Sequence, residues 1–96
     1  MPGSDHFVLL RVHLHFPEAG SLKTKRKDLQ SVKVRLRKRF GAAVAEVDHH
    51  DLWQRSTLCV ALVGGGSEEI ERFLHAALPD GVRVERATLS AGEVFH

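Results

Sequence analysis

Phe7–Phe16, with the sequence FVLLRVHLHF, is followed after a short break by Ser21–Gly41, with the sequence SLKTKRKDLQSVKVRLRKRFG. In the first segment every second residue from Val8 onward is apolar, so one face of a strand would be wholly apolar. Pro17 and Gly20 then end the strand. In the second segment the apolar residues recur as they do along one side of a helix. Together the segments predict a strand that leads into a long helix.

The helix is predicted over Leu22–Phe40. Ser21 is a good N-cap, because its hydroxyl can accept a hydrogen bond from a free amide of the first turn. Gly41 fits the position just after the helix, where the backbone commonly turns left-handed. The apolar residues are spaced by 7, 3, 4 and 4 positions, and they are Leu22, Leu29, Val32, Leu36 and Phe40.

The rest of the chain continues the pattern of strands and helices. Ala42–Asp48 is predicted as a short strand, and Trp53–Val63 as a longer one whose two apolar faces favour a central position. A second helix is predicted with Ser67 as its N-cap, and Val82–Leu89 as the last strand. The order β-α-β-β-α-β is that of the ferredoxin-like fold, class α+β. Right-handed crossovers would place both helices on one face of a four-stranded antiparallel sheet and leave the other face open.

Length and composition favour one small domain over residues 1–96, with residues 1–6 as a loose leader. Cys59 is the one cysteine, so no internal disulfide can form, which fits a reducing cytoplasm. No apolar run approaches the roughly 20 residues that span a bilayer, and the N-terminus lacks the pattern of a signal peptide. A cytoplasmic protein without membrane contact is predicted.

The charge is distributed unevenly along the chain. Residues 1–40 contain ten Lys and Arg against three Asp and Glu, whereas residues 41–96 contain four against nine, and the whole carries a net charge of +2. Nine of the basic residues lie within positions 23–39, with Asp28 as the one acid among them. Such asymmetry indicates either an anionic partner for one half or ion pairs between the halves.

Two segments resemble a known family. Ser21–Arg26 (SLKTKR) enters the helix after the alternating strand, and Val44–Val47 (VAEV) precedes Asp51–Arg55 (DLWQR). In this order, with the apolar strand that ends at Val63, they resemble the YlxP-like family of small bacterial proteins over residues 7–90. The resemblance implies a ferredoxin-like fold and a family without an established biochemical function. It also implies a link to translation, because the family's genes tend to lie near those of a ribosome-binding factor and a translation initiation factor.

The basic part of the first helix is the candidate nucleic-acid interface. Affinity for nucleic acid comes largely from phosphate contacts that release counterions, and Lys and Arg on an exposed helix make such contacts without reading a sequence. The alternative is a solvated face whose charges pair with acids of the other half. Arg26 borders the apolar stripe and fits a structural role with a buried stem equally well. The candidate residues are Lys23, Lys25, Lys27, Lys33, Arg35, Arg37, Lys38 and Arg39.

The open face of the sheet is the second candidate surface. A partly apolar face favours a protein interface, such as a homodimer. Base stacking is disfavoured, because RNA-recognition modules of similar topology stack bases on aromatic side chains, whereas this chain has no Tyr and lacks their signature. Trp53 is either a loop anchor or a partner contact. The candidate residues are Phe7, Leu9, Arg11, His13, His15, Trp53 and Arg55.

Neither a metal nor a cofactor is assigned. His13 and His15 point the same way on one strand, and His49, His50 and Asp51 are adjacent in sequence. Imidazole and carboxylate groups can bind zinc or nickel, but the spacing matches no known structural site. Ordinary surface histidines account for the pattern.

Enzymatic activity is not expected. The Ser and Cys residues lie in no recognisable catalytic motif, and Cys59 has apolar neighbours within a strand. Acylphosphatases have the same topology but use an Asn, and this chain contains none. The sequence predicts a non-enzymatic accessory protein that contacts RNA or the ribosome through its first helix. The alternative is a protein-interaction module or homodimer that uses the open face and has no nucleic-acid role.

Overall fold

The computed structural model describes residues 6–17, 20–48, 54–78 and 81–95. The elements follow one another in the predicted order, with one short helix added at the end. They are β1 (His6–His15), α1 (Leu22–Phe40), β2 (Ala43–Asp48), β3 (Arg55–Val63), α2 (Ser67–Ala77), β4 (Val82–Ser90) and α3 (Ala91–Val94).

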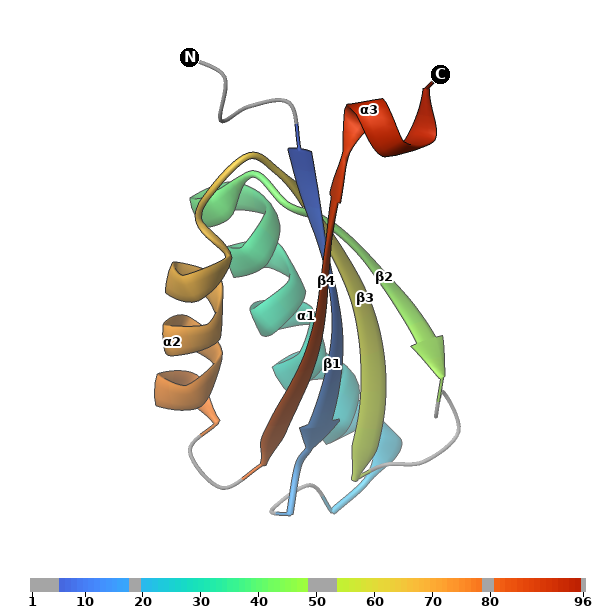
Figure 1. Ribbon diagram of the computed structural model, residues 1–96. Coiled ribbons are helices and arrows are strands. Elements are labelled where there is room, and N and C mark those ends of the chain that lie inside the picture. Colours follow the sequence, from blue (N-terminus) through green and yellow to red (C-terminus); the bar gives the residue numbers. More distant parts are fainter. Residues whose placement is uncertain (1–5, 18–19, 49–53, 79–80, 96) are drawn as a thin grey trace.

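The strands form one antiparallel sheet in the order β2-β3-β1-β4. The central strand β1 pairs with β3 from Phe7 opposite Val63 to His15 opposite Arg55, and with β4 on its other side. Both α1 and α2 lie on one face of the sheet, while α3 lies beyond the end of β4 (Figure 1). The ferredoxin-like α+β arrangement is confirmed, and among the described elements neither long helix covers the second face.

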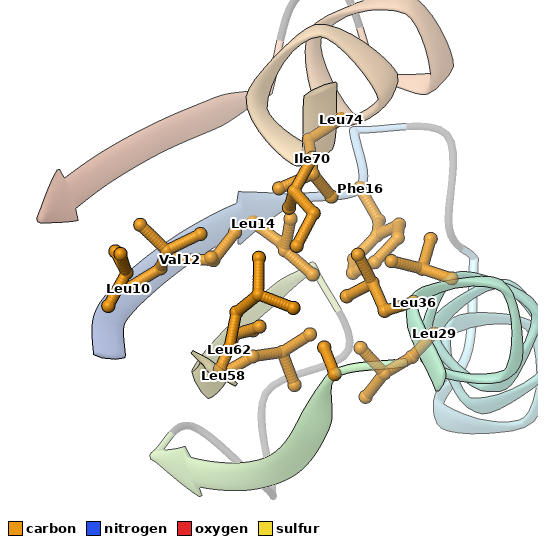
Figure 2. Close-up of a cluster of buried hydrophobic side chains, with 14 residues drawn as sticks. Leu10, Val12, Leu14, Phe16, Leu29, Leu36, Leu58, Leu62, Ile70 and Leu74 are labelled. Atoms are coloured by element: carbon orange, nitrogen blue, oxygen red, sulfur yellow. The ribbon is translucent and has the colours of Figure 1, made fainter. Parts of the chain in front are cut away.

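The core lies between the sheet and the two long helices. The alternation in β1 buries Val8, Leu10, Val12 and Leu14, as predicted, and the opposite face of that strand stays partly exposed. Figure 2 shows Ile70 and Leu74 of α2 and Leu29 and Leu36 of α1 around the β1 and β3 side chains. The buried apolar residues are Val8, Leu10, Val12, Leu14, Phe16, Leu29, Val32, Leu36, Ala42, Leu58, Val60, Leu62, Ile70 and Leu74.

The ends of α1 follow the sequence signals. The Ser21 hydroxyl accepts a hydrogen bond from the Thr24 amide at 3.2 Å, which satisfies one free donor of the first turn. Gly41 has φ of 68°, the left-handed conformation that glycine adopts without a steric penalty. Its amide donates to the carbonyl of Arg37 at 3.1 Å and ends the helix. Both predicted caps of α1 are therefore confirmed.

The start of α2 differs from the prediction by one residue. Gly66, with φ of 113°, is the N-cap, and Ser67 is the first helical residue. Ser67 is buried, and Arg86 donates a long 3.5 Å hydrogen bond to its hydroxyl. The physical reason is the positive φ, which a serine would adopt only under strain. Three consecutive glycines before Ser67 did not reveal which of them would form the N-cap with this conformation.

The short helix α3 was not predicted. Ser90 precedes it, and the Ser90 amide donates to the Glu93 carboxylate at 3.1 Å. This Ser-x-x-Glu spacing is a signal for a helix start that the sequence does carry. Phe95 follows the helix and is 77% exposed. No helix among the described residues is long and apolar enough to cross a membrane.

Candidate nucleic-acid interface and open sheet face

Seven of the eight predicted nucleic-acid residues keep at least part of their side chains in solvent. The buried side of α1 consists of Lys25, Leu29, Val32 and Leu36. Because each helical residue turns by about 100°, the positions of Lys23, Lys27 and Lys38 are directed away from that side. Lys33 is half-buried, and the fully exposed members are Lys23, Lys27, Arg35, Arg37, Lys38 and Arg39.

Lys25 is the exception, and its assignment to the nucleic-acid interface is corrected. Its side chain is 1% exposed and its Nζ lies 3.7 Å from Oε2 of Glu46 on β2. The same carboxylate oxygen accepts a 2.8 Å hydrogen bond from the buried Ser56 hydroxyl of β3. Lys25 therefore joins α1 to two strands of the sheet, and it has no surface with which to meet a phosphate.

Two of the exposed arginines also contact the rest of the fold. The Arg37 guanidinium donates to the carbonyl of Val44 at 3.0 Å, which ties the helix to β2. The guanidinium carbon of Arg39 lies 5.2 Å from the ring centre of Phe40 and 5.8 Å from that of Phe73. A cation over an aromatic face is held by the ring quadrupole but keeps its charge. Both side chains therefore have fixed places on the surface of α1.

Three acids of α2 and β4 form ion pairs with residues outside α1. Glu69 pairs with Arg72, Glu71 with Arg86, and Glu85 with His13. Within residues 6–17, 20–48, 54–78 and 81–95, no carboxylate forms an ion pair with an exposed Lys or Arg of α1. In the described part of the chain, the one ion pair that joins α1 to the acidic half is that of the buried Lys25 with Glu46, and the exposed Lys and Arg of the helix form none.

The open sheet face is divided into an apolar end and a polar end. Phe7 and Leu9 lie at the apolar end, opposite Leu89 and Ala87 on β4 and Val63 and Ala61 on β3. Val63 is 76% exposed, although it lies on β3, one of the two central strands of the sheet. The neighbouring α3 segment adds the exposed side chains of Val94 and Phe95.

The polar end contains Arg11, His13, His15 and Arg55 from the predicted interface. Here β4 adds Arg83 and Glu85, which lie opposite His13 and Arg11. These two residues were not among the predicted interface residues. The alternation of Val82 and Val84 with Arg83 and Glu85 was the signal that would have placed them on this face. Trp53 lies outside the described residues.

His13 and Glu85 form a close side-chain contact on the open face. His13 Nε2 lies 2.6 Å from Glu85 Oε1, and its Nδ1 lies 3.5 Å from the buried Thr57 hydroxyl. The hydrogen bond from His13 lowers the pKa of Glu85, with smaller contributions from the charges of His13, Arg11 and Arg83. Because the folded-state pKa is lowered, the stability from this carboxylate is present above its ordinary pKa and is lost as pH falls through the folded value.

Among the described residues, no group of three or more His, Cys, Asp and Glu side chains is placed to hold a metal ion. His13 and His15 share the open face, as expected for alternate residues of a strand. His49, His50 and Asp51 lie outside the described residues. Cys59 is half-buried in β3.

The amino-acid sequence of the chain matches one protein family and one named relative. Residues 7–88 match the family described as "Protein of unknown function (DUF503)". The uncharacterized protein YlxP of Bacillus subtilis (strain 168) is 33% identical over 61 residues. That match covers 64% of this chain and 66% of YlxP, slightly less than two thirds of its length. The resemblance to the YlxP-like family is confirmed.

Comparison with solved structures corrects one expectation. The crystal structure of a mutant of SnoaB, a cofactor-independent oxygenase from Streptomyces nogalater, matches with a TM-score of 0.52. The match covers 91% of this chain and 93% of SnoaB at 10% identity, which shows a shared fold alone. Because an enzyme has this architecture, the fold does not exclude enzymatic activity. The expectation that the chain is not an enzyme is therefore wrong, and the question of an activity is open.

Proposed function

The chain belongs to the DUF503 family of proteins of unknown function, and we propose that it contacts RNA or the ribosome through the exposed basic surface of α1. The observation that carries this proposal is the absence of acidic partners, in the described part of the chain, for the exposed Lys and Arg of that helix. A cationic surface that the fold itself does not neutralise attracts a polyanion from solution.

The geometry of α1 supports a backbone-directed mode of binding. Its 19 residues span about 28 Å, enough to follow several successive phosphates. Lys and Arg provide point charges and bidentate donors for phosphate oxygens. Such contacts fix position but carry no sequence information. We therefore infer that the protein binds RNA with little sequence preference, and that it does so in the cytoplasm. The resemblance to the YlxP-like family also implies a link to translation.

Lysine footprinting tests this proposal, because all the lysines of the chain lie on α1: Lys23, Lys25, Lys27, Lys33 and Lys38. We expect single-stranded RNA to slow the reaction of Lys23, Lys27 and Lys38 with an amine-reactive reagent, as read by mass spectrometry. Lys25 is expected to react slowly with or without RNA, because it is buried.

High salt provides the control for the footprint. Since phosphate contacts release counterions, protection is expected to disappear at about 0.5 M salt. RNA that binds the protein but leaves the rates of Lys23, Lys27 and Lys38 unchanged would place the interface elsewhere.

A homodimer through the open sheet face is the second candidate function. It is supported by the apolar end formed by the half-buried Phe7 and Leu9 and the exposed Val63, since contiguous apolar patches commonly mark protein interfaces. This role is compatible with RNA binding, because α1 lies on the other side of the sheet (Figure 1).

Substitution of Leu9 by lysine tests the dimer. We expect the wild-type protein to show twice its 10.7 kDa mass in light scattering at high concentration, and Leu9→Lys to show the single mass. An ammonium group buried in an interface without a partner is costly, so the dimer would dissociate. Ala76→Lys, at an exposed position of α2, provides the matched control and should dimerise normally. A wild-type protein that stays monomeric at the highest concentration would contradict this candidate.

A further inference from the structure

A hollow of about 480 Å³ opens at the polar end of the open sheet face, where β1 ends and β4 begins. It is a different place from the basic surface of α1, which lies on the other side of the sheet (Figure 1). The hollow is lined by His13, Leu14, His15, Arg55, Ser56, Thr57, Gly81, Val82 and Arg83.

Gly81 helps to keep this hollow open. The His15 amide donates to the Gly81 carbonyl at 2.7 Å, which brings the two backbones together. A Cβ atom at position 81 would overlap the carbonyl oxygen of His15. A glycine is therefore required for this close approach, and it leaves one wall of the hollow without a side chain.

The side chains around the hollow form a positively charged clamp. Arg55 lies opposite His15 on one flank of β1, and Arg83 lies opposite His13 on the other flank. Neighbouring strands are about 4.8 Å apart, so both guanidinium groups can reach a ligand placed over β1. At the base of the hollow the buried Thr57 hydroxyl lies 3.5 Å from His13 Nδ1.

One carboxylate faces this clamp from β4. Glu85 is held by His13 at 2.6 Å, and the charges of Arg11 and Arg83 also lower its pKa. It is therefore ionised and already compensated by its neighbours. Among the described residues, the polar end carries the three guanidinium groups of Arg11, Arg55 and Arg83 against the single carboxylate of Glu85, so the charge of this described set is positive even with neutral histidines.

We propose that the hollow binds the phosphate group of a small phosphorylated molecule, with Arg55 and Arg83 as its two clamps. Phosphate oxygens match the planar fork of a guanidinium group, which donates two parallel hydrogen bonds. Thr57 and His13 line the hollow beside the two arginines, and a ligand bound there would lie next to both. This site is independent of the proposed RNA interface, since it uses none of the α1 side chains.

Titration with inorganic phosphate, followed by amide chemical shifts, tests the site. We expect saturable shifts at His13, Thr57 and Arg83, with half-saturation below about 10 mM. Losing one charge-assisted hydrogen bond weakens binding about tenfold or more, so Arg55→Gln/Arg83→Gln should weaken it about 100-fold. Both arginines are exposed, so this variant should keep the circular dichroism spectrum of the wild type.

Arg26→Gln/Arg72→Gln provides the matched control, because it removes the same charge from exposed positions of α1 and α2 that belong to neither proposed site. This control should bind phosphate as the wild type does. The proposal is overturned if the shifts concentrate on α1, or if the Arg55→Gln/Arg83→Gln variant keeps wild-type affinity. It is also overturned if acetate binds as tightly as phosphate, because a carboxylate would then be the ligand class. Failure of the site would leave lysine protection by RNA unaffected.

Discussion

Replacing Lys23, Lys27 and Lys38 by glutamine is expected to weaken the binding of single-stranded RNA by about 100-fold at about 0.1 M salt. Each lysine that neutralises a phosphate of a single strand releases about 0.7 counterion. Three such contacts at about 0.1 M salt correspond to about two orders of magnitude in affinity. Glutamine is a good helix former, so α1 itself should persist. Fluorescence anisotropy of a labelled RNA measures the change directly.

The choice of these three lysines follows from the fold. They are exposed and make none of the hydrogen bonds or ion pairs found among the described residues. Arg37 and Arg39 are avoided, because they bond to β2 and stack near Phe40 and Phe73. A loss of affinity can then be attributed to lost phosphate contacts. A variant that unfolds or loses helical signal in circular dichroism would contradict this description of α1.

Substitution of Glu46 by alanine is expected to lower the free energy of unfolding by about 3 kcal/mol. Glu46 accepts a hydrogen bond from Ser56 at 2.8 Å and lies 3.7 Å from the Nζ of Lys25, whose side chain is 1% exposed. Removing one partner of a buried ion pair leaves the other charge poorly compensated, which typically costs about 3–5 kcal/mol. For a domain of this size such a loss lowers the melting temperature by about 15 °C, which calorimetry would record.

Glu71→Ala provides the matched control for that substitution. Glu71 also forms an ion pair, with Arg86 at 3.5 Å, but the arginine is exposed and the pair is solvated. Exposed ion pairs contribute about 0–1 kcal/mol, so this variant should melt within a few degrees of the wild type. Equal effects of the two substitutions would mean that the Lys25–Glu46 pair does not behave as a buried one.

Lys25 also shows where the sequence pattern was insufficient. Its position four residues before Leu29 places it on the buried side of α1, but its charge grouped it with the neighbouring lysines. Only the long-range packing of β2 and β3 supplies Glu46 and Ser56 as its neighbours. Periodicity of apolar residues predicted the helix and its face, whereas a buried charge depends on partners that are distant in sequence.

The residues that line the polar hollow could not be predicted from the sequence, for a similar reason. His13 and His15 were expected on the open face from the alternation in β1, and they lie there. Their neighbours Arg55 and Arg83 come from two other strands, and the register that aligns them is set by the whole sheet. A one-residue slip of β4 would have placed Arg83 on the core face. The order of strands was predictable from the chain, but the composition of the hollow was not.

The basic surface itself follows from local sequence, because helix spacing alone determines which side chains point outward. Whether acids cover those side chains depends on the tertiary fold. In the described residues Glu69 and Glu71 of α2 and Glu85 of β4 pair with Arg72, Arg86 and His13 instead. This arrangement is the basis for assigning RNA binding to α1.

The most direct measurement of that assignment is the ratio of RNA affinities between two variants with equal net charge. Lys23→Gln/Lys27→Gln/Lys38→Gln removes three charges from α1, and Arg11→Gln/Arg55→Gln/Arg83→Gln removes three from the open sheet face. On the same RNA at about 0.1 M salt, binding through α1 predicts that the first variant binds about 100-fold more weakly than the second. Equal affinities, or a weaker second variant, would contradict it.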